Sequence, residues 1–241
     1  FGAAATASLS ELAQSVVLEG VGDSIRARPP GRDSDQSFNG VGLPLLQLNH
    51  SRLAEDGGYW WWHTPDDTRD KVDARVLKTD ADLYAAALAR LLAEPTYPVS
   101  LSATVERLGS LLRDRQEQAG SHFDLSEALA RQGELLEVVR RVEASLPTGG
   151  DAEVDLALVA ILRPVHRVLY THLGPYHPDP AEAMGALPGM NAVDMLVSND
   201  PDTDRYRFAL TTVQREMARI LEALDQAQAE AEELLEVLRG R

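Results

Sequence analysis

The sequence predicts a mainly α protein in which an α/β portion, residues 1–95, precedes a helical bundle, residues 96–241. In the second part, apolar residues recur at helical spacing over long stretches separated by short turns, which is typical of a bundle. The first part instead breaks short apolar runs with Gly and Pro. The boundary is placed at Glu94–Pro98, whose two prolines end the preceding helical pattern.

The first element expected is a short helix over about residues 9–20. Leu9, Leu12 and Val16 recur at helical spacing, and Gly20 provides a typical C-terminal stop. The alternating segment 24–28 is a candidate strand, and a proline-rich breaker follows it.

A second strand is expected at Leu43–Leu48, a short apolar run that suits the interior of an α/β sheet. The order helix, strand, loop, strand makes only part of a sheet. We therefore expect residues 43–48 to lack partner strands, which would favour aggregation.

Five helices follow in the predicted order. Each has an apolar stripe at helical spacing and ends near Gly or Pro. Their expected ranges are about 72–93, 101–119, 125–145, 153–173 and 203–238. Asp200–Asp204 has the alternating carboxylates of a calcium loop, but Arg205 stands where that loop needs Gly, so we interpret the segment as a turn and helix N-cap.

Composition excludes several classes of protein. The 241 residues carry a formal net charge of −15, which argues against nucleic acid as a partner because phosphate neutralisation needs clustered Lys and Arg. No apolar run approaches the ~20 residues of a membrane helix, so we expect no membrane span. The absence of cysteine excludes disulfides and thiolate catalysis but leaves the cellular compartment open.

The strongest local feature is Trp60–Thr68, in which His63 stands between three tryptophans and the carboxylates of Asp66 and Asp67. An imidazole nitrogen can bind a metal ion while nearby acceptors orient the other ring nitrogen. Two simpler interpretations remain open at this point. Asp66, Asp67 and Thr68 would cap the following helix, and the tryptophans would belong to the core or an interface.

Four pieces of sequence, in order, resemble the end of the catalytic domain of co-catalytic zinc exopeptidases. This family includes bacterial zinc aminopeptidases, glutamate carboxypeptidase and the catalytically silent transferrin receptor ectodomain. The pieces are residues 33–38, 40–44, 62–68 and 70–73. A looser resemblance, over residues 187–219, is to the helical region that takes part in dimer formation in the larger relatives.

The resemblance implies a site of two zinc ions, built from two histidines and three carboxylates, with a separate glutamate as general base. Only His63 matches a metal-ligand position in this chain, so no catalytic residue is assigned here, and the isolated chain is expected to be inactive. Further residues are assigned to the surroundings of the metal or to a substrate loop. These are Asp35, Phe38, Trp62, Asp66 and Asp67.

The leading hypothesis is therefore the C-terminal portion of an aminopeptidase-like zinc exopeptidase. It would act on peptide substrates together with an N-terminal portion of the same enzyme, which the start at Phe1 without Met also suggests, and it would form a homodimer. Trp62 stands where relatives often have a Tyr that stabilises the tetrahedral intermediate. The alternatives are a catalytically silent, transferrin receptor-like dimerisation module and an unrelated acidic helical scaffold.

Overall fold

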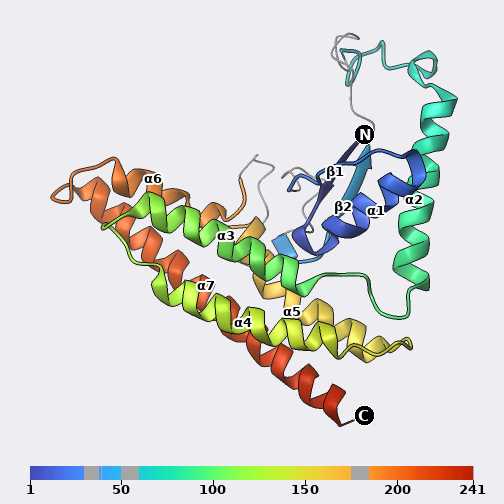
Figure 1. Ribbon diagram of the computed structural model, residues 1–241. Coiled ribbons are helices and arrows are strands. Elements are labelled where there is room, and N and C mark those ends of the chain that lie inside the picture. The colour runs from blue at the N-terminus through green and yellow to red at the C-terminus, as the bar shows by residue number, and fades with distance from the viewer. Residues whose placement is uncertain (30–37, 39, 50–59, 175–184, 241) are drawn as a thin grey trace.

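Helices form most of the protein, as the sequence predicts. The computed structural model describes residues 1–29, 38, 40–49, 60–174 and 185–240 (Figure 1). The helices are α1 (Ser10–Val21), α2 (Ala74–Ala93), α3 (Leu101–Ala119), α4 (Ser126–Ala144), α5 (Ala152–Tyr170), α6 (Ala192–Val197) and α7 (Asp204–Arg239). Short 3-10 helices cover Ala7–Leu9 (η1), Arg69–Lys71 (η4) and Pro188–Asn191 (η5). In this part of the chain no helix has the length and apolar character that crossing a membrane requires.

The described strands form one small antiparallel sheet. Strand β1 (Gly2–Ala5) pairs with β2 (Leu46–Asn49), with Ala5 opposite Leu46. The prediction that residues 43–48 lack a partner strand is therefore wrong over residues 46–48, because β1 pairs with them. Strand β1 is not evident from the sequence, because a run of alanines has low strand propensity. The strand forms here because Ala3 and Ala5 are buried.

The predicted strand at 24–28 is reduced to a single bridge. Arg28 pairs with Ala4 in a parallel sense, and the backbone N–H of Arg28 donates to the carbonyl of Ala3 at 2.9 Å. The apolar members of the segment, Ile25 and Ala27, still pack against the core of the first 95 residues, whereas Arg26 and Arg28 are exposed.

Buried side chains form two hydrophobic clusters. The smaller one joins β1, α1 and β2 to the inner face of α2, where Leu83 and Ala87 are buried. The larger one fills the space between α3, α4, α5 and α7 and extends to η5 and α6. The side chain of Val99 packs against both clusters, so it lies where the two meet.

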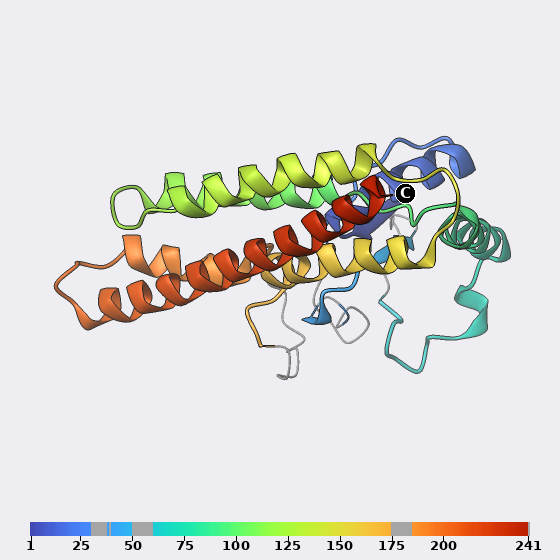
Figure 2. The same ribbon diagram turned by 90° about the horizontal axis from the view of Figure 1, so that it is seen from below.

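The second cluster is the core of a bundle of long helices. α7 runs along α4, α5 and α6, and α3 packs beside α4 and α5 (Figures 1 and 2). The observed ranges agree with the predicted helices to within a few residues. The turn before α7 also has its expected role, since Thr203 Oγ1 accepts a hydrogen bond from Tyr206 N at 3.3 Å. The short α6 was not predicted.

The connection between α2 and α3 is bonded to both sides. Ser100 N donates to the carbonyl of Ser8 at 2.9 Å, which joins it to the N-terminal unit. Tyr97 N donates to Asp155 Oδ1 at 2.7 Å, which joins it to α5 of the bundle. Ser100 Oγ also caps α3 by accepting from Ala103 N at 3.1 Å.

Candidate functional site

The histidine loop, residues 60–73, leads into the N-terminus of α2. In Figure 1 it lies at the end of α2 that is distant from the helical bundle. Its backbone turns twice in succession, because Thr64 N donates to the carbonyl of Trp61 at 2.9 Å and Asp67 N donates to the carbonyl of Thr64 at 3.1 Å. The loop is thus shaped by its own local hydrogen bonds.

Threonine side chains add to this local order. Thr64 Oγ1 donates to the carbonyl of Trp61 at 2.5 Å and accepts from Asp66 N at 3.2 Å. Thr68 Oγ1 donates to the carboxylate of Asp70 and also lies 3.2 Å from the carbonyl oxygen of Asp66. These hydroxyls substitute for backbone partners, as Ser and Thr do in turns.

Asp70 links two of the motif's polar groups. Its Oδ2 lies 2.6 Å from Lys71 Nζ, and its Oδ1 accepts from Thr68. The hydrogen bonds from Lys71 and then Thr68 lower the pKa of the Asp70 carboxyl to about 2. Asp70 belongs to the last piece of the zinc exopeptidase-like sequence, and its contacts give it a role in organising the loop.

Asp73 begins helix α2. Its Oδ1 accepts from Arg75 N at 2.7 Å, and this hydrogen bond lowers the pKa of the carboxyl. The alternative interpretation, in which Asp66, Asp67 and Thr68 cap the following helix, is therefore wrong for α2, because its cap is Asp73. The sequence signal for this cap is an Asp directly before the helical pattern.

His63 stands at the tip of the first turn in an unusual backbone conformation. Its φ is 62°, in the left-handed region that few residues other than Gly adopt. Its imidazole stacks on the indole of Trp62, with ring centroids 3.8 Å apart and planes inclined by 27°. The ring is exposed and has no hydrogen-bond partner among the residues that the structure describes. A ring held in this way is available to an external ligand.

The other predicted site residues are also exposed where they are described. Asp66 and Asp67 lie in the second turn of the loop, and both residues are exposed. Trp62 and Phe38 are 60% and 62% exposed, so neither packs in a core between the sheet and the bundle. Asp35 lies outside the described residues.

Metal ligands do not gather around His63 within this chain. Over residues 1–29, 38, 40–49, 60–174 and 185–240, no group of three or more His, Asp or Glu side chains is placed to hold a metal ion. A zinc site needs at least three protein ligands. The structure thus places His63, Asp66 and Asp67 on one exposed loop but supplies no metal-ligand set from the described chain.

The glycine-proline motif of residues 40–44 packs on the bundle. Gly42 has a φ of 81°, and a Cβ built on it would lie 2.4 Å from the carbonyl oxygen of Arg163. Only Gly fits such an approach to the α5 backbone. This contact fixes the entry to β2 against the helical part.

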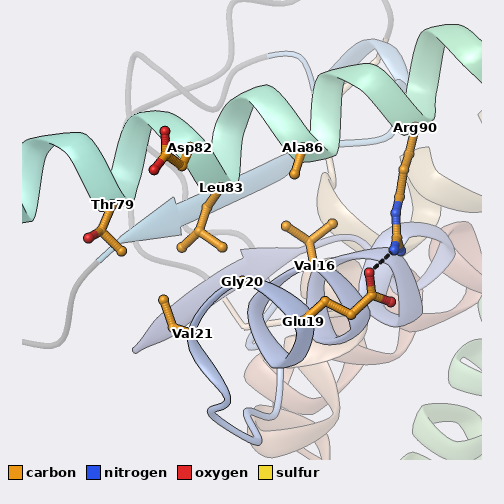
Figure 3. Close-up of a pocket in the computed structure, with 9 residues that line it drawn as sticks. All are labelled: Val16, Glu19, Gly20, Val21, Thr79, Asp82, Leu83, Ala86 and Arg90. Carbon is orange, nitrogen blue, oxygen red and sulfur yellow. Dashed lines mark hydrogen bonds and ion pairs between the residues drawn. The ribbon is translucent and has the colours of Figure 1, made fainter.

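A separate pocket lies between α1 and α2 (Figure 3). Val16 and Leu83 face one another across it, and Arg90 closes one end through its ion pair with Glu19 and a 2.7 Å hydrogen bond to Ser15. Gly20 allows the close packing, since a Cβ there would lie 2.3 Å from a Leu83 methyl carbon. We interpret this pocket as part of the helix packing.

Comparisons with known proteins add no assignment. No protein-family model, curated protein or solved structure matches the chain.

Proposed function

We propose that this chain is the C-terminal portion of a zinc-dependent, aminopeptidase-like exopeptidase, in which His63 is a metal ligand. The observation that carries the proposal is the presentation of His63. Its ring is exposed, stacked on Trp62 and set at a backbone angle that costs free energy, yet it belongs to neither hydrophobic cluster of the described residues.

The surrounding loop supports the same role. Thr64, Thr68 and Asp70 give the turn its shape without using the His63 ring, so the hydrogen bonds that order the loop leave the candidate ligand free. The ordered match of residues 62–68 and 70–73 to the zinc exopeptidase motif adds to this. The remaining ligands and the general base would come from an N-terminal portion of the enzyme.

Two zinc ions, when bound, would activate water for attack on a peptide bond and polarise the scissile carbonyl. This chain's own part is to hold one imidazole in position. Trp62 limits rotation of the ring by stacking, and Asp66 and Asp67 place negative charge beside it. Trp62 offers an indole N–H where relatives often offer a tyrosine hydroxyl, so it can donate a hydrogen bond but not accept one.

The test uses the full natural protein in two measurements. Zinc content is determined by mass spectrometry, and cleavage of aminoacyl-p-nitroanilides is followed by absorbance. We expect about two zinc ions per chain and exopeptidase activity, both reduced in His63→Gln. Circular dichroism should show unchanged helix content, because the exposed ring contributes no core contact.

His122→Gln is the matched control, because His122 lies in the bundle and its imidazole contacts the Tyr206 hydroxyl at 3.4 Å, far along the chain from the histidine loop. It should keep metal and activity. Metal-free wild-type protein without exopeptidase activity would refute the proposal, as would a His63→Gln variant with full zinc content and full activity.

A non-enzymatic interaction module is the second candidate, favoured by one flank of α2. Leu77, Leu88 and Leu92 are 59%, 55% and 78% exposed, although the opposite flank of the same helix is buried against α1 and β2. A helix whose apolar face extends beyond the part that its neighbours cover typically has a further packing partner. This role also suits the proposed homodimer.

The two candidates differ in a measurable way. Light scattering after size-exclusion chromatography on wild type and Leu88→Ser/Leu92→Ser would show whether this flank drives association. A dimer that the double variant converts to monomer, in a protein without zinc or activity, would favour the module. A zinc-loaded, active protein would favour the enzyme whatever its oligomeric state.

A further inference from the structure

A groove of about 710 Å³ lies where the N-terminal unit meets the bundle. Its walls come from four places: segment 26–29, the N-terminal half of α3, the start of α1 with the residues before it, and Tyr170 at the end of α5. The lining includes three arginines, Arg26, Arg28 and Arg107. The groove shares no residue with the histidine loop, so ligand binding here does not depend on the proposed peptidase activity.

The segment before Pro29 contributes two guanidinium groups to the groove. Ile25 and Ala27 pack against the smaller core, whereas Arg26 and Arg28 are exposed. Both arginines line the groove, together with Ala27 between them. The bridge between Arg28 and Ala4 fixes this backbone.

The opposite wall adds a third guanidinium and a buried hydroxyl. Arg107 lies on α3, partly buried, and its positive charge acts on the phenol of Tyr170. Tyr170 is 5% exposed, and its oxygen accepts a hydrogen bond from Ala7 N at 3.0 Å. Burial raises the pKa of Tyr170, so the phenol keeps its proton, and no described residue accepts that proton in a hydrogen bond.

The charges in the groove favour an anion. Two carboxylates, Glu11 and Glu106, also line it, and Glu106 is bound at 2.9 Å by Arg140 from outside the lining. None of the three lining guanidinium groups forms an ion pair with a residue that the structure describes. Three arginines without an ion-pair partner in the described part of the chain thus line one groove, in contrast with the net charge of −15 on the chain.

We propose that this groove binds a small ligand with two or more negative charges, through phosphate or carboxylate oxygens held by Arg26, Arg28 and Arg107. Guanidinium groups suit both oxyanions because their paired N–H groups match two oxygens at once. The Tyr170 hydroxyl, at the floor of the groove, donates a further hydrogen bond to the ligand.

The test is isothermal titration calorimetry on the full chain, at constant ionic strength and pH 8, with inorganic phosphate and with tricarballylate as separate probes. We expect saturable binding of at least one probe with a stoichiometry of about one, given a single groove. Binding of phosphate alone or of tricarballylate alone supports the site and identifies which oxyanion it takes. The double variant Arg26→Gln/Arg28→Gln should weaken binding by about tenfold or more.

The matched control is Arg205→Gln/Arg215→Gln, which removes the same charge from exposed positions on α7 outside the groove. It should leave the affinity within about twofold of wild type, because distant exposed charges are screened by salt. The proposal is overturned if neither probe binds saturably to wild type, or if the control variant loses as much affinity as the groove variant.

Discussion

The side chain of Gln132 lies directly over Gly109, where α4 packs on α3. Gln132 is 5% exposed, and its Nε2 donates to the carbonyl of Val105 at 3.1 Å. A Cβ built on Gly109 would lie 2.5 Å from Gln132 Oε1. The absence of a side chain at residue 109 therefore lets a buried amide reach the backbone of the neighbouring helix.

Gly109→Ala should destabilise the protein, although Ala is the better helix former. The gain in helix propensity is about 1 kcal/mol, whereas crowding a buried side chain costs about 1–3 kcal/mol. Displacing Gln132 would also break its hydrogen bond to Val105, so we expect a net loss of about 1–2 kcal/mol in the free energy of unfolding. Urea denaturation followed by circular dichroism measures it.

Gly133→Ala is the control for that prediction. Gly133 is adjacent to Gln132 in α4, and a Cβ there would meet no atom within 4 Å. This substitution should stabilise the protein by about 0.5–1 kcal/mol. Equal effects of the two alanines would contradict the close packing described at Gly109.

His166 should make stability depend on pH. Burial lowers the pKa of this α5 histidine from 6.5 to about 4, so the folded protein keeps it neutral while the unfolded chain binds a proton below about pH 6.5. The unfolding free energy should therefore fall as pH drops from 6.5 to about 4, by an amount on the order of 3 kcal/mol from this group. Above pH 6.5 it contributes no pH dependence.

His166→Leu isolates that contribution. Other groups titrate over the same range in both proteins, so the difference between wild type and variant reports His166. The decrease in unfolding free energy between pH 7 and pH 4, from urea denaturation at each pH, should be smaller in the variant. An identical decrease in both would show that His166 does not titrate differently on folding.

Asp151 should stabilise the folded protein by the amount typical of one helix N-cap. Its Oδ1 accepts from Glu153 N at 2.9 Å and from Val154 N at 3.3 Å at the start of α5. Asp151→Ala should lower the free energy of unfolding by about 1 kcal/mol, while Asp151→Asn, which keeps an accepting oxygen, should retain most of it. If the two substitutions cost the same in thermal or urea denaturation, the cap is not the source of the effect.

The carboxyl of Asp70 should titrate near pH 2. Hydrogen bonds from Lys71 and Thr68 stabilise its charged form, so these two contacts of Asp70 should persist until the pH falls to about that value. Carbon-detected NMR titration measures the pKa directly. Lys71→Gln should raise this pKa toward the ordinary value of 3.8. An unchanged pKa in that variant would show that Lys71 does not lower the pKa of Asp70.

Local sequence patterns were sufficient to predict the long helices. The stripe in α7 and the Thr203 cap are properties of neighbouring residues, so they can be read without the rest of the fold. Strand β1 could not be predicted in this way. Its alanines form a strand only because β2, more than 40 residues later, pairs with them, and pairing at that distance leaves no local signal.

The histidine loop and the arginine groove differ in the same way, because one is formed by local contacts and the other by packing between distant segments. The His63 loop is formed by contacts over two or three residues, and its motif is visible in the sequence. The arginine groove joins Arg26 and Arg28 to Arg107 and Tyr170, which lie on separate elements, so only the packing of the N-terminal unit against α3 and α5 brings them together. No spacing rule could have selected them.

The segment between α2 and α3 has a mechanical consequence. Backbone donors at Tyr97 and Ser100 are bonded to opposite sides, to Asp155 in the bundle and to Ser8 in the N-terminal unit. These bonds favour one arrangement of the two units, because a large rotation between them would strain or break the bonds. The segment therefore joins the N-terminal unit to α5 more firmly than the covalent chain alone would.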